Sequence, residues 1–176
     1  SRVMQAAYPL LRPSLEKIHG RIAVSEDARR TVTTHIGGDA VVIPNGVDTG
    51  VFARATRDPR WSGAPGRPTL VFLGRIDEPR KGLPVLAAAM PAILDAIPGA
   101  RLLVVGPGSV ESARARLPER VLAATEFLGA LSDEDKASAL ASADLYIAPH
   151  TGGESFGIVL VEAMAAGTPV VAFNAS

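Results

Sequence analysis

Cysteine is absent from the 176 residues of this chain, so neither a disulfide framework nor thiolate chemistry is available to it. Aromatic residues make up only 5% of the sequence, and the core must therefore be built mainly from alanine, valine, leucine and isoleucine. No run of about 18 apolar residues occurs, so no membrane-spanning helix is expected. The 18 basic residues balance 18 acidic ones, which gives no electrostatic reason to expect a nucleic acid partner.

Histidine is also scarce, and its distribution argues against a metal site. His19, His35 and His150 lie far apart, and no two of them have the spacing of metal ligands. We interpret His150 as a structural loop residue. The chain starts at Ser1 rather than methionine and stops at Ser176, directly after an apolar run typical of a strand, so we expect a segment cut from a longer protein.

Short β-branched runs alternate with longer alanine-rich stretches from about Thr69 onward. This pattern predicts strands at 69–73, 102–105, 126–128, 145–148 and 169–172, and helices at 82–97, 110–116, 133–142 and 157–166. Pro84 suits the first turn of its helix, whereas Pro91 should kink it. Uniformly apolar strands that alternate with helices indicate a Rossmann-like α/β fold, in which helices cover both faces of a parallel sheet. Ligands bind such sheets beyond the carboxyl ends of the strands.

The first 48 residues have a different pattern. They predict a helix at 4–17, strands at 21–24 and 41–43, and a short helix opened by Ser25. Pro9 and Pro13 should kink or interrupt the first helix. The segment Arg54–Arg67 is polar and rich in proline and glycine, so we expect a loop there.

The first cluster of candidate functional residues lies in the segment Gly74–Gly82, between a predicted strand and a predicted helix. Arg75, Arg80 and Lys81 converge there with the unpaired N–H groups of a helix N-terminus. Such a combination favours a diphosphate ligand. The alternative is a solvated charged loop with no ligand.

The second cluster centres on Glu162, the only charged residue between Ser155 and Gly167. Its helix is otherwise apolar all round, so we expect the helix to be buried and the carboxylate to need a partner. A ribose diol could supply two donors; the alternative is a core ion pair with a nearby arginine. Glu154 precedes the helix, where a transferred sugar would lie, and Gly157 would let a phosphate approach the helix N-terminus.

Two longer segments carry a resemblance to a known family. They are G-R-I-D-E-P-R-K-G and G-G-E-S-F-G-I-V-L-V-E-A-M-A-A-G-T-P-V-V-A, and R-I-A-V-S and I-P-N-G-V-D extend the match over nearly the whole chain. The sequence resembles the family 4 retaining glycosyltransferases of GT-B fold, whose E-x7-E motif is matched by Glu154 and Glu162. Within that family it is most similar to the actinobacterial phosphatidylinositol α-mannosyltransferases, which use GDP-mannose.

The resemblance implies a role for each matched residue. Arg75 and Lys81 would bind the diphosphate and stabilise it as a leaving group, with Arg80 as a neighbour, and Glu154 would hold the hydroxyls of the sugar. Arg75, Lys81 and Glu154 are thus the candidate catalytic residues, and Glu162 is the candidate ribose ligand. The loop that meets phosphates and sugar would be Ser155, Phe156, Gly157 and Ile158, and the guanine would be met by Leu131, Ser132, Asp133 and Lys136.

The resemblance also implies a partial protein. The family has two Rossmann-like domains with the active site between them, so residues 1–48 would be a remnant of the first domain and residues 49–176 a truncated second domain. The missing part would bind the phosphatidylinositol acceptor and contact the inner face of the plasma membrane peripherally, from the cytoplasm. No metal or other cofactor would be needed to bind the donor. We expect this chain to bind nucleotide weakly and to catalyse no transfer by itself.

Of three alternatives considered, the first two remain open. A transferase of the same family could use a UDP donor carrying N-acetylglucosamine or glucose, which competition between GDP and UDP would reveal. The chain could instead be a non-catalytic sugar-nucleotide-binding or interaction module. The presence of all four motif residues argues against this, because a module without a ligand need not keep them; they are Arg75, Lys81, Glu154 and Glu162. An epimerase or phosphorylase is not supported, because no motif for a pyridoxal lysine is present. A dinucleotide cofactor is not expected, because Gly106-Pro107-Gly108 lacks the third glycine of that fingerprint.

Overall fold

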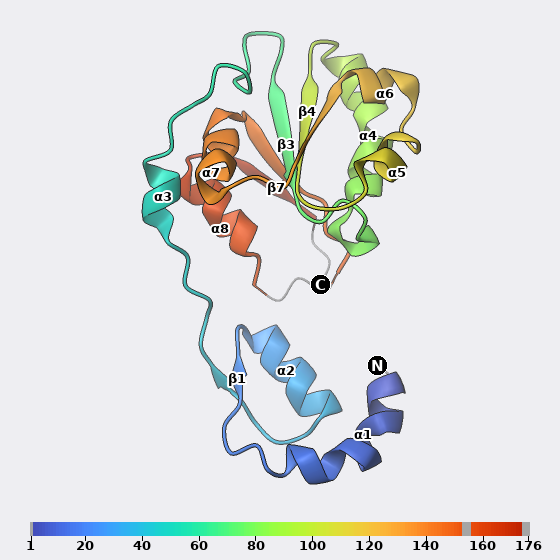
Figure 1. Ribbon diagram of the computed structural model, residues 1–176, viewed down its shortest axis with the longest axis vertical. Helices are drawn as coiled ribbons and strands as arrows, with labels where there is room; N and C mark the ends of the chain where they lie inside the picture. The colour runs from blue at the N-terminus through green and yellow to red at the C-terminus, as the bar shows by residue number, and fades with distance from the viewer. Residues whose placement is uncertain (1, 153–155, 174–176) are drawn as a thin grey trace. The chain divides into compact units, whose positions relative to one another are not determined.

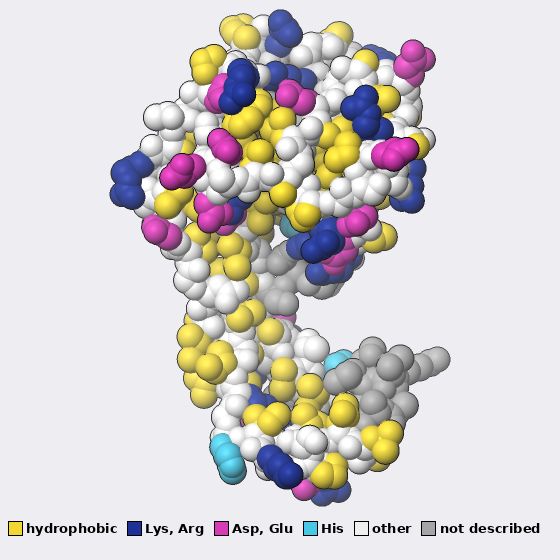
Figure 2. Space-filling model, in the orientation of Figure 1, with side chains coloured by type: hydrophobic (Ala, Val, Ile, Leu, Met, Phe, Trp, Pro, Cys, Tyr) yellow, Lys and Arg dark blue, Asp and Glu magenta, His cyan; other side chains and the backbone are white. Residues whose placement is uncertain are grey.

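The computed structural model describes residues 2–152 and 156–173, with side chains described from Tyr8 onward. The described residues form two compact units, one of residues 2–46 with 156–157 and one of residues 47–152 with 158–173 (Figure 1). On the face of the larger unit seen in Figure 2, acidic and basic side chains are interspersed rather than gathered by sign.

The smaller unit is built from two helices and two short strands. They are α1 (Arg2–Leu15), β1 (Ile22–Ala23), α2 (Glu26–His35) and β2 (Val41–Val42). The strands pair in parallel, with Ile22 opposite Val41, and both of these side chains are about two-thirds exposed. The N–H of Ala28 donates to Ser25 Oγ (3.1 Å), so Ser25 caps α2 as predicted. Helix α1 includes Pro9 and Pro13, and neither proline interrupts it.

The larger unit contains a five-stranded parallel sheet in the order β5-β4-β3-β6-β7, which confirms the predicted α/β class. Its strands are β3 (Thr69–Leu73), β4 (Arg101–Val105), β5 (Thr125–Gly129), β6 (Leu145–Ala148) and β7 (Val170–Ala172). Its helices are α3 (Thr49–Ala53), the 3₁₀ turn η1 (Pro79–Lys81), α4 (Leu83–Ala96), α5 (Val110–Arg114), α6 (Glu119–Ala123), α7 (Asp133–Ser142) and α8 (Ile158–Ala165).

Alternating side chains of the strands form two cores, one on each face of the sheet. Leu70 and Phe72 of β3 belong to the core covered by α4, α5 and α6. Val71 of the same strand belongs to the other core, together with Tyr146 and Trp61. Helices α3, α7 and α8 cover this core, on the side of the sheet away from α4, α5 and α6 (Figure 1). Burial of each such side chain contributes about 1.5–3 kcal/mol.

Some sequence-based expectations were wrong. Helix α8 is not buried all round: Met164 is 63% exposed, because the helix packs on α3 and α7 along one side only. The sheet was expected to be covered on both faces, but strand β7 lies at one edge of it and exposes Val171. Helices α3 and α6 and the turn η1 were not predicted, since each has five residues or fewer and too little periodicity to recognise. Pro91 does not end α4, which runs as one helix from Leu83 to Ala96, and the expected kink at Pro91 stays a prediction.

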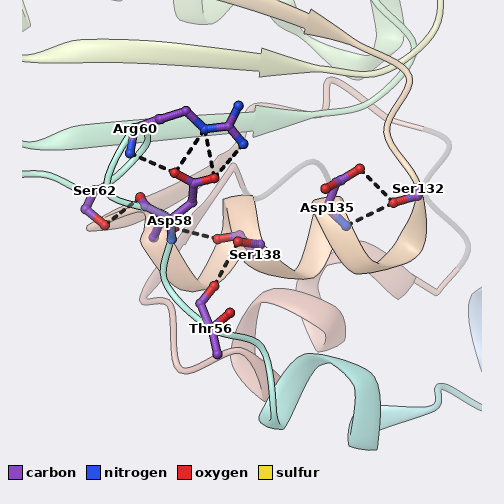
Figure 3. A network of polar contacts seen from close by, with 8 residues as sticks. Thr56, Asp58, Arg60, Ser62, Ser132, Asp135 and Ser138 are labelled. Atoms are coloured by element: carbon purple, nitrogen blue, oxygen red, sulfur yellow. Dashed lines mark hydrogen bonds and ion pairs between the residues drawn. The ribbon is translucent and has the colours of Figure 1, made fainter.

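The segment 54–67 carries no helix or strand, as predicted, but it is packed against α7 (Figure 3). Ser138 Oγ donates to the carbonyl of Thr56 (2.8 Å), and the N–H of Asp58 donates to Ser142 Oγ (2.7 Å). Trp61 is only 6% exposed. The segment 54–67 is therefore packed as part of the larger unit.

Two glycines with positive φ differ in the space around them, and only one of them lies in the loop before α4. Gly82 has φ of +82°, and a methyl group there would lie 1.8 Å from the carbonyl oxygen of Pro149; Gly129 has φ of +68° with open space around it. We expect Gly82→Ala to lower the free energy of unfolding by about 3 kcal/mol, because overpacking adds to backbone strain. Gly129→Ala, which carries the strain alone, should cost about 1 kcal/mol. Urea denaturation of both variants checks this, and equal losses would contradict it.

Candidate functional site

The basic loop after β3 is held by the loops that follow its two neighbouring strands. The N–H of Ile76 donates to the carbonyl of Pro107 (2.8 Å), beyond β4, and the N–H of Thr151, beyond β6, donates to the carbonyl of Arg80 (3.0 Å). Gly106 allows the close approach, because it has φ of +141° and a methyl group there would lie 2.0 Å from the carbonyl oxygen of Gly74. The loop is therefore fixed at the carboxyl edge of the sheet.

The three predicted cations of this loop differ in their surroundings. Arg75 is exposed, and its guanidinium has no hydrogen-bond or ion-pair partner in residues 2–152 and 156–173. Arg80 forms an ion pair with Glu78, which partly neutralises its charge. Lys81 is half-buried, and its side-chain stem passes next to Gly74. The structure thus places Arg75 and Lys81 on the same loop, whereas the charge of Arg80 is already shared with Glu78.

Glu162 projects from α8 and is only 7% exposed. Its Oε1 accepts a hydrogen bond from Lys136 Nζ of α7 (2.9 Å). Its Oε2 is buried and has no hydrogen-bond partner among the described residues. The expected need for a partner is confirmed, but the partner is a lysine rather than the arginine considered from the sequence, and half of the carboxylate remains unsatisfied.

Lys136 has three neighbours that together fix its ammonium group. Besides Glu162, it forms an ion pair with Asp133 (2.9 Å), and its Nζ lies 5.2 Å from the centre of the Phe52 ring. Burial acts to lower the pKa of Lys136, but the hydrogen bonds to Glu162 and Asp133 outweigh it and raise the pKa above its ordinary value. One cation thus faces two carboxylates, and the surplus negative charge favours a ligand that offers hydroxyl donors. Phe52 was not singled out from the sequence, because the short helix α3 was not predicted.

The predicted base-binding residues lie at the start of α7. Ser132 Oγ accepts from the N–H of Asp135 (3.1 Å) and donates to Asp135 Oδ2 (2.9 Å), so it caps the helix as predicted (Figure 3). Leu131 is half-buried, and the side chain of Asp133 is 82% exposed. Of the four predicted base-binding residues, Ser132, Asp133 and Lys136 already have intramolecular partners.

The remaining predicted residues precede or begin α8. Glu154 and Ser155 lie outside the described residues. Phe156 is half-buried, Gly157 is buried with φ of +79°, and Ile158 is the first residue of α8 and is 40% exposed. In the described part of the chain, histidine, cysteine, aspartate and glutamate form no cluster of three that could hold a metal. Nor does that part contain a helix long and apolar enough to cross a membrane.

Comparison with known proteins supports a shared family. Residues 67–176 match the sequence profile of the family described as "Glycosyl transferases group 1". The chain is 55% identical over 164 residues to phosphatidyl-myo-inositol mannosyltransferase of Mycobacterium tuberculosis. This match covers 93% of this chain and 42% of the relative. It is 37% identical over 142 residues to the GDP-mannose-dependent monoacylated alpha-(1-6)-phosphatidylinositol monomannoside mannosyltransferase of Corynebacterium glutamicum, covering 74% of this chain and 37% of the relative. The chain therefore spans less than half the length of these relatives.

Solved structures share the fold. The Anabaena protein HepE, in complex with UDP and glucose, superposes with a TM-score of 0.75 at 24% identity, over 96% of this chain and 47% of its own. AviGT4, a glycosyltransferase involved in avilamycin A biosynthesis, gives a TM-score of 0.61 at 29% identity, over 86% of this chain and 43% of its own.

The bond between Lys136 and Glu162 can be tested by its effect on stability. We expect Lys136→Met to lower the free energy of unfolding by about 3 kcal/mol, because it leaves a buried carboxylate without its cation. Combining it with Glu162→Gln, which removes the uncompensated charge, should recover most of that loss. Urea denaturation at pH 7 measures both, and a loss no larger than that of a surface substitution would contradict the prediction.

The same pair has a defined pH dependence. Since the pKa of Lys136 is raised in the folded state, its stabilisation is complete below the unfolded value of 10.5 and is lost as pH rises through the raised value. The difference in stability between the unsubstituted chain and Lys136→Met should therefore narrow only above pH 10.5. If this difference in stability already narrowed at neutral pH, the ion pair between Lys136 and Glu162 would not be the source of the difference.

Proposed function

Because this chain belongs to the group 1 glycosyl transferases, we propose that its larger unit binds the nucleotide part of GDP-mannose. The observation that carries the proposal is the buried, unbonded Oε2 of Glu162. A carboxylate oxygen shielded from water without a donor is costly, and a ligand hydroxyl would remove that cost. The two hydroxyls of a ribose are donors of this kind.

The basic loop supplies the complementary charge for the diphosphate. Arg75 offers an exposed guanidinium without a described partner, and Lys81 lies six residues along the same loop. Charge-assisted hydrogen bonds from these two groups would hold the diphosphate and stabilise it as it leaves. Protein cations would thereby take the role that a metal ion has in other transferases. Arg80 has a smaller part in this proposal, since Glu78 already pairs with it.

The donor sugar and the acceptor are inferred from relatives. The two mannosyltransferases named above support mannose as the transferred sugar, and one of them is described as GDP-mannose-dependent. Phosphatidylinositol is the proposed acceptor, and the whole protein would act with retention at the anomeric carbon. Glu154 would hold the hydroxyls of the sugar, and the loop 155–158 would meet the phosphates and the sugar. The guanine would be met by Leu131, Ser132, Asp133 and Lys136. Residues beyond this chain would bind the acceptor and contact the membrane surface peripherally.

Calorimetric titration with GDP and then UDP, each without metal and with magnesium, tests the donor. Metal-independent binding that prefers GDP is the expected result. A preference for UDP would favour the alternative of a UDP-sugar transferase in the same family. If this chain binds neither nucleotide, the titration is repeated on the full-length protein, and a negative result there would overturn the proposal.

Substitution of the loop cations tests the diphosphate site. We expect Lys81→Ala and Arg75→Ala each to weaken GDP binding by ~10-fold or more, the loss of one charge-assisted hydrogen bond. Arg114→Ala removes an exposed arginine from α5 and is the matched control, for which affinity should not change. Unchanged affinity in Lys81→Ala would remove Lys81 from the site.

A further inference from the structure

Helix α4 has a second apolar stripe that the sheet does not need. Its core-facing stripe is Leu83, Leu86, Met90 and Leu94, all at most 5% exposed. A second stripe, spaced i, i+3, i+4 and i+7, is Pro84, Ala87, Ala88 and Pro91. The outward side of a surface helix is ordinarily polar, yet Asp95 is the only charged residue of α4. The second stripe therefore calls for an explanation other than core packing.

This second stripe lines a pocket of about 400 Å³, which we call the α4 pocket. The pocket is also lined by Ala113 at the end of α5 and by Leu117 and Pro118 of the segment that joins α5 to α6. The alanines and prolines of the lining leave a hollow that longer side chains would fill. Its size falls within the roughly 300–1,000 Å³ of small-molecule sites. In Figure 2, hydrophobic side chains are visible between charged ones over the region of α4, α5 and α6.

One charged side chain lies at this otherwise apolar pocket. Arg116 is exposed, and nowhere in the described parts of the chain does its guanidinium find a hydrogen-bond or ion-pair partner. Apolar walls with a single free cation complement a molecule that is apolar along its length and negative at one end. They do not complement a peptide helix, which would need a longer groove, or a nucleotide, which is polar throughout.

We propose that the α4 pocket binds one acyl chain whose terminal carboxylate pairs with Arg116. The acyl chain would lie along Pro84, Ala87, Ala88 and Pro91. This site is separate from the carboxylate–lysine pair of α7 and α8, which belongs to the opposite core.

The same pocket is connected to the basic loop. Ile76 and Leu83 contribute to its wall, and both are 5% exposed. Ile76 directly follows Arg75, and Leu83 directly follows Gly82, so the pocket restrains both ends of the loop. An acyl chain packed against these two side chains would favour the arrangement of the loop that they support, and if a nucleotide needs the same arrangement, binding of each ligand would strengthen the other. This coupling rests on the proposed diphosphate site, whereas the pocket does not.

Titration of dodecanoate, below the concentration at which it forms micelles, tests the pocket, with dodecanol as the uncharged control. We expect Ala88→Phe, which fills the pocket, to weaken dodecanoate binding at least tenfold. Ala89→Phe, on an exposed neighbouring position that does not line the pocket, should leave it unchanged. Arg116→Gln should weaken dodecanoate but not dodecanol, with Arg114→Gln as its control; both are exposed, so neither should affect folding. For the coupling, saturating dodecanoate should tighten GDP binding about fivefold.

Distinct results would overturn each part. Dodecanoate binding that survives both Ala88→Phe and Arg116→Gln would refute the site, and equal binding of dodecanol and dodecanoate would refute the pairing with Arg116. Binding by this chain but not by the full-length protein would show that another segment covers the pocket, which also refutes the proposal. Unchanged GDP affinity at saturating dodecanoate would refute the coupling alone. Absence of GDP binding, with dodecanoate binding intact, would overturn the nucleotide site and leave the pocket standing.

Discussion

Strand β3 is hydrogen-bonded to β4 on one side and to β6 on the other, and all three run in parallel. Their carboxyl ends therefore meet at one edge, where Gly74, Gly106 and Pro149 follow in turn. Most strand residues are apolar and belong to two cores, and the charged loop emerges beyond the carboxyl end of β3. The close backbone packing at Gly82 and Gly106 then determines where the charged loop lies.

The two charged regions at this edge suit different parts of one ligand. The loop after β3 offers cations that attract an anion, whereas the pair on α7 and α8 offers surplus carboxylate oxygen that accepts from hydroxyl groups. Lys136 donates to one oxygen of Glu162 and leaves the other without a hydrogen bond. The carboxylate is therefore held in one orientation and can still accept a hydrogen bond from a ligand. A nucleotide carries phosphates and a ribose diol in fixed proximity, which matches this division.

Much of the fold could be predicted because its strands are short apolar runs between clear turn signals. The predicted bounds of α7 and β6 agree with the structure, and β3 likewise. Helices α3 and α6 could not be predicted, because helices of five residues are stabilised by packing rather than by a visible period. Lys136 and Glu162 are 26 residues apart in the sequence and lie on different helices, so no local pattern predicts the bond between them. The ion pair of Arg80 with Glu78 spans only two residues, and it could have been anticipated.

Trp61 is the only tryptophan of the chain, and its ring lies buried in the core beneath α7, with the guanidinium of Arg60 5.0 Å from the ring centre. The smaller unit contains no tryptophan at all. Intrinsic tryptophan emission therefore reports the packing of the segment 54–67 in the larger unit. It does not report the folding of the smaller unit. A single fluorescence transition would not establish that the two units unfold together, and a backbone signal such as circular dichroism is needed beside it.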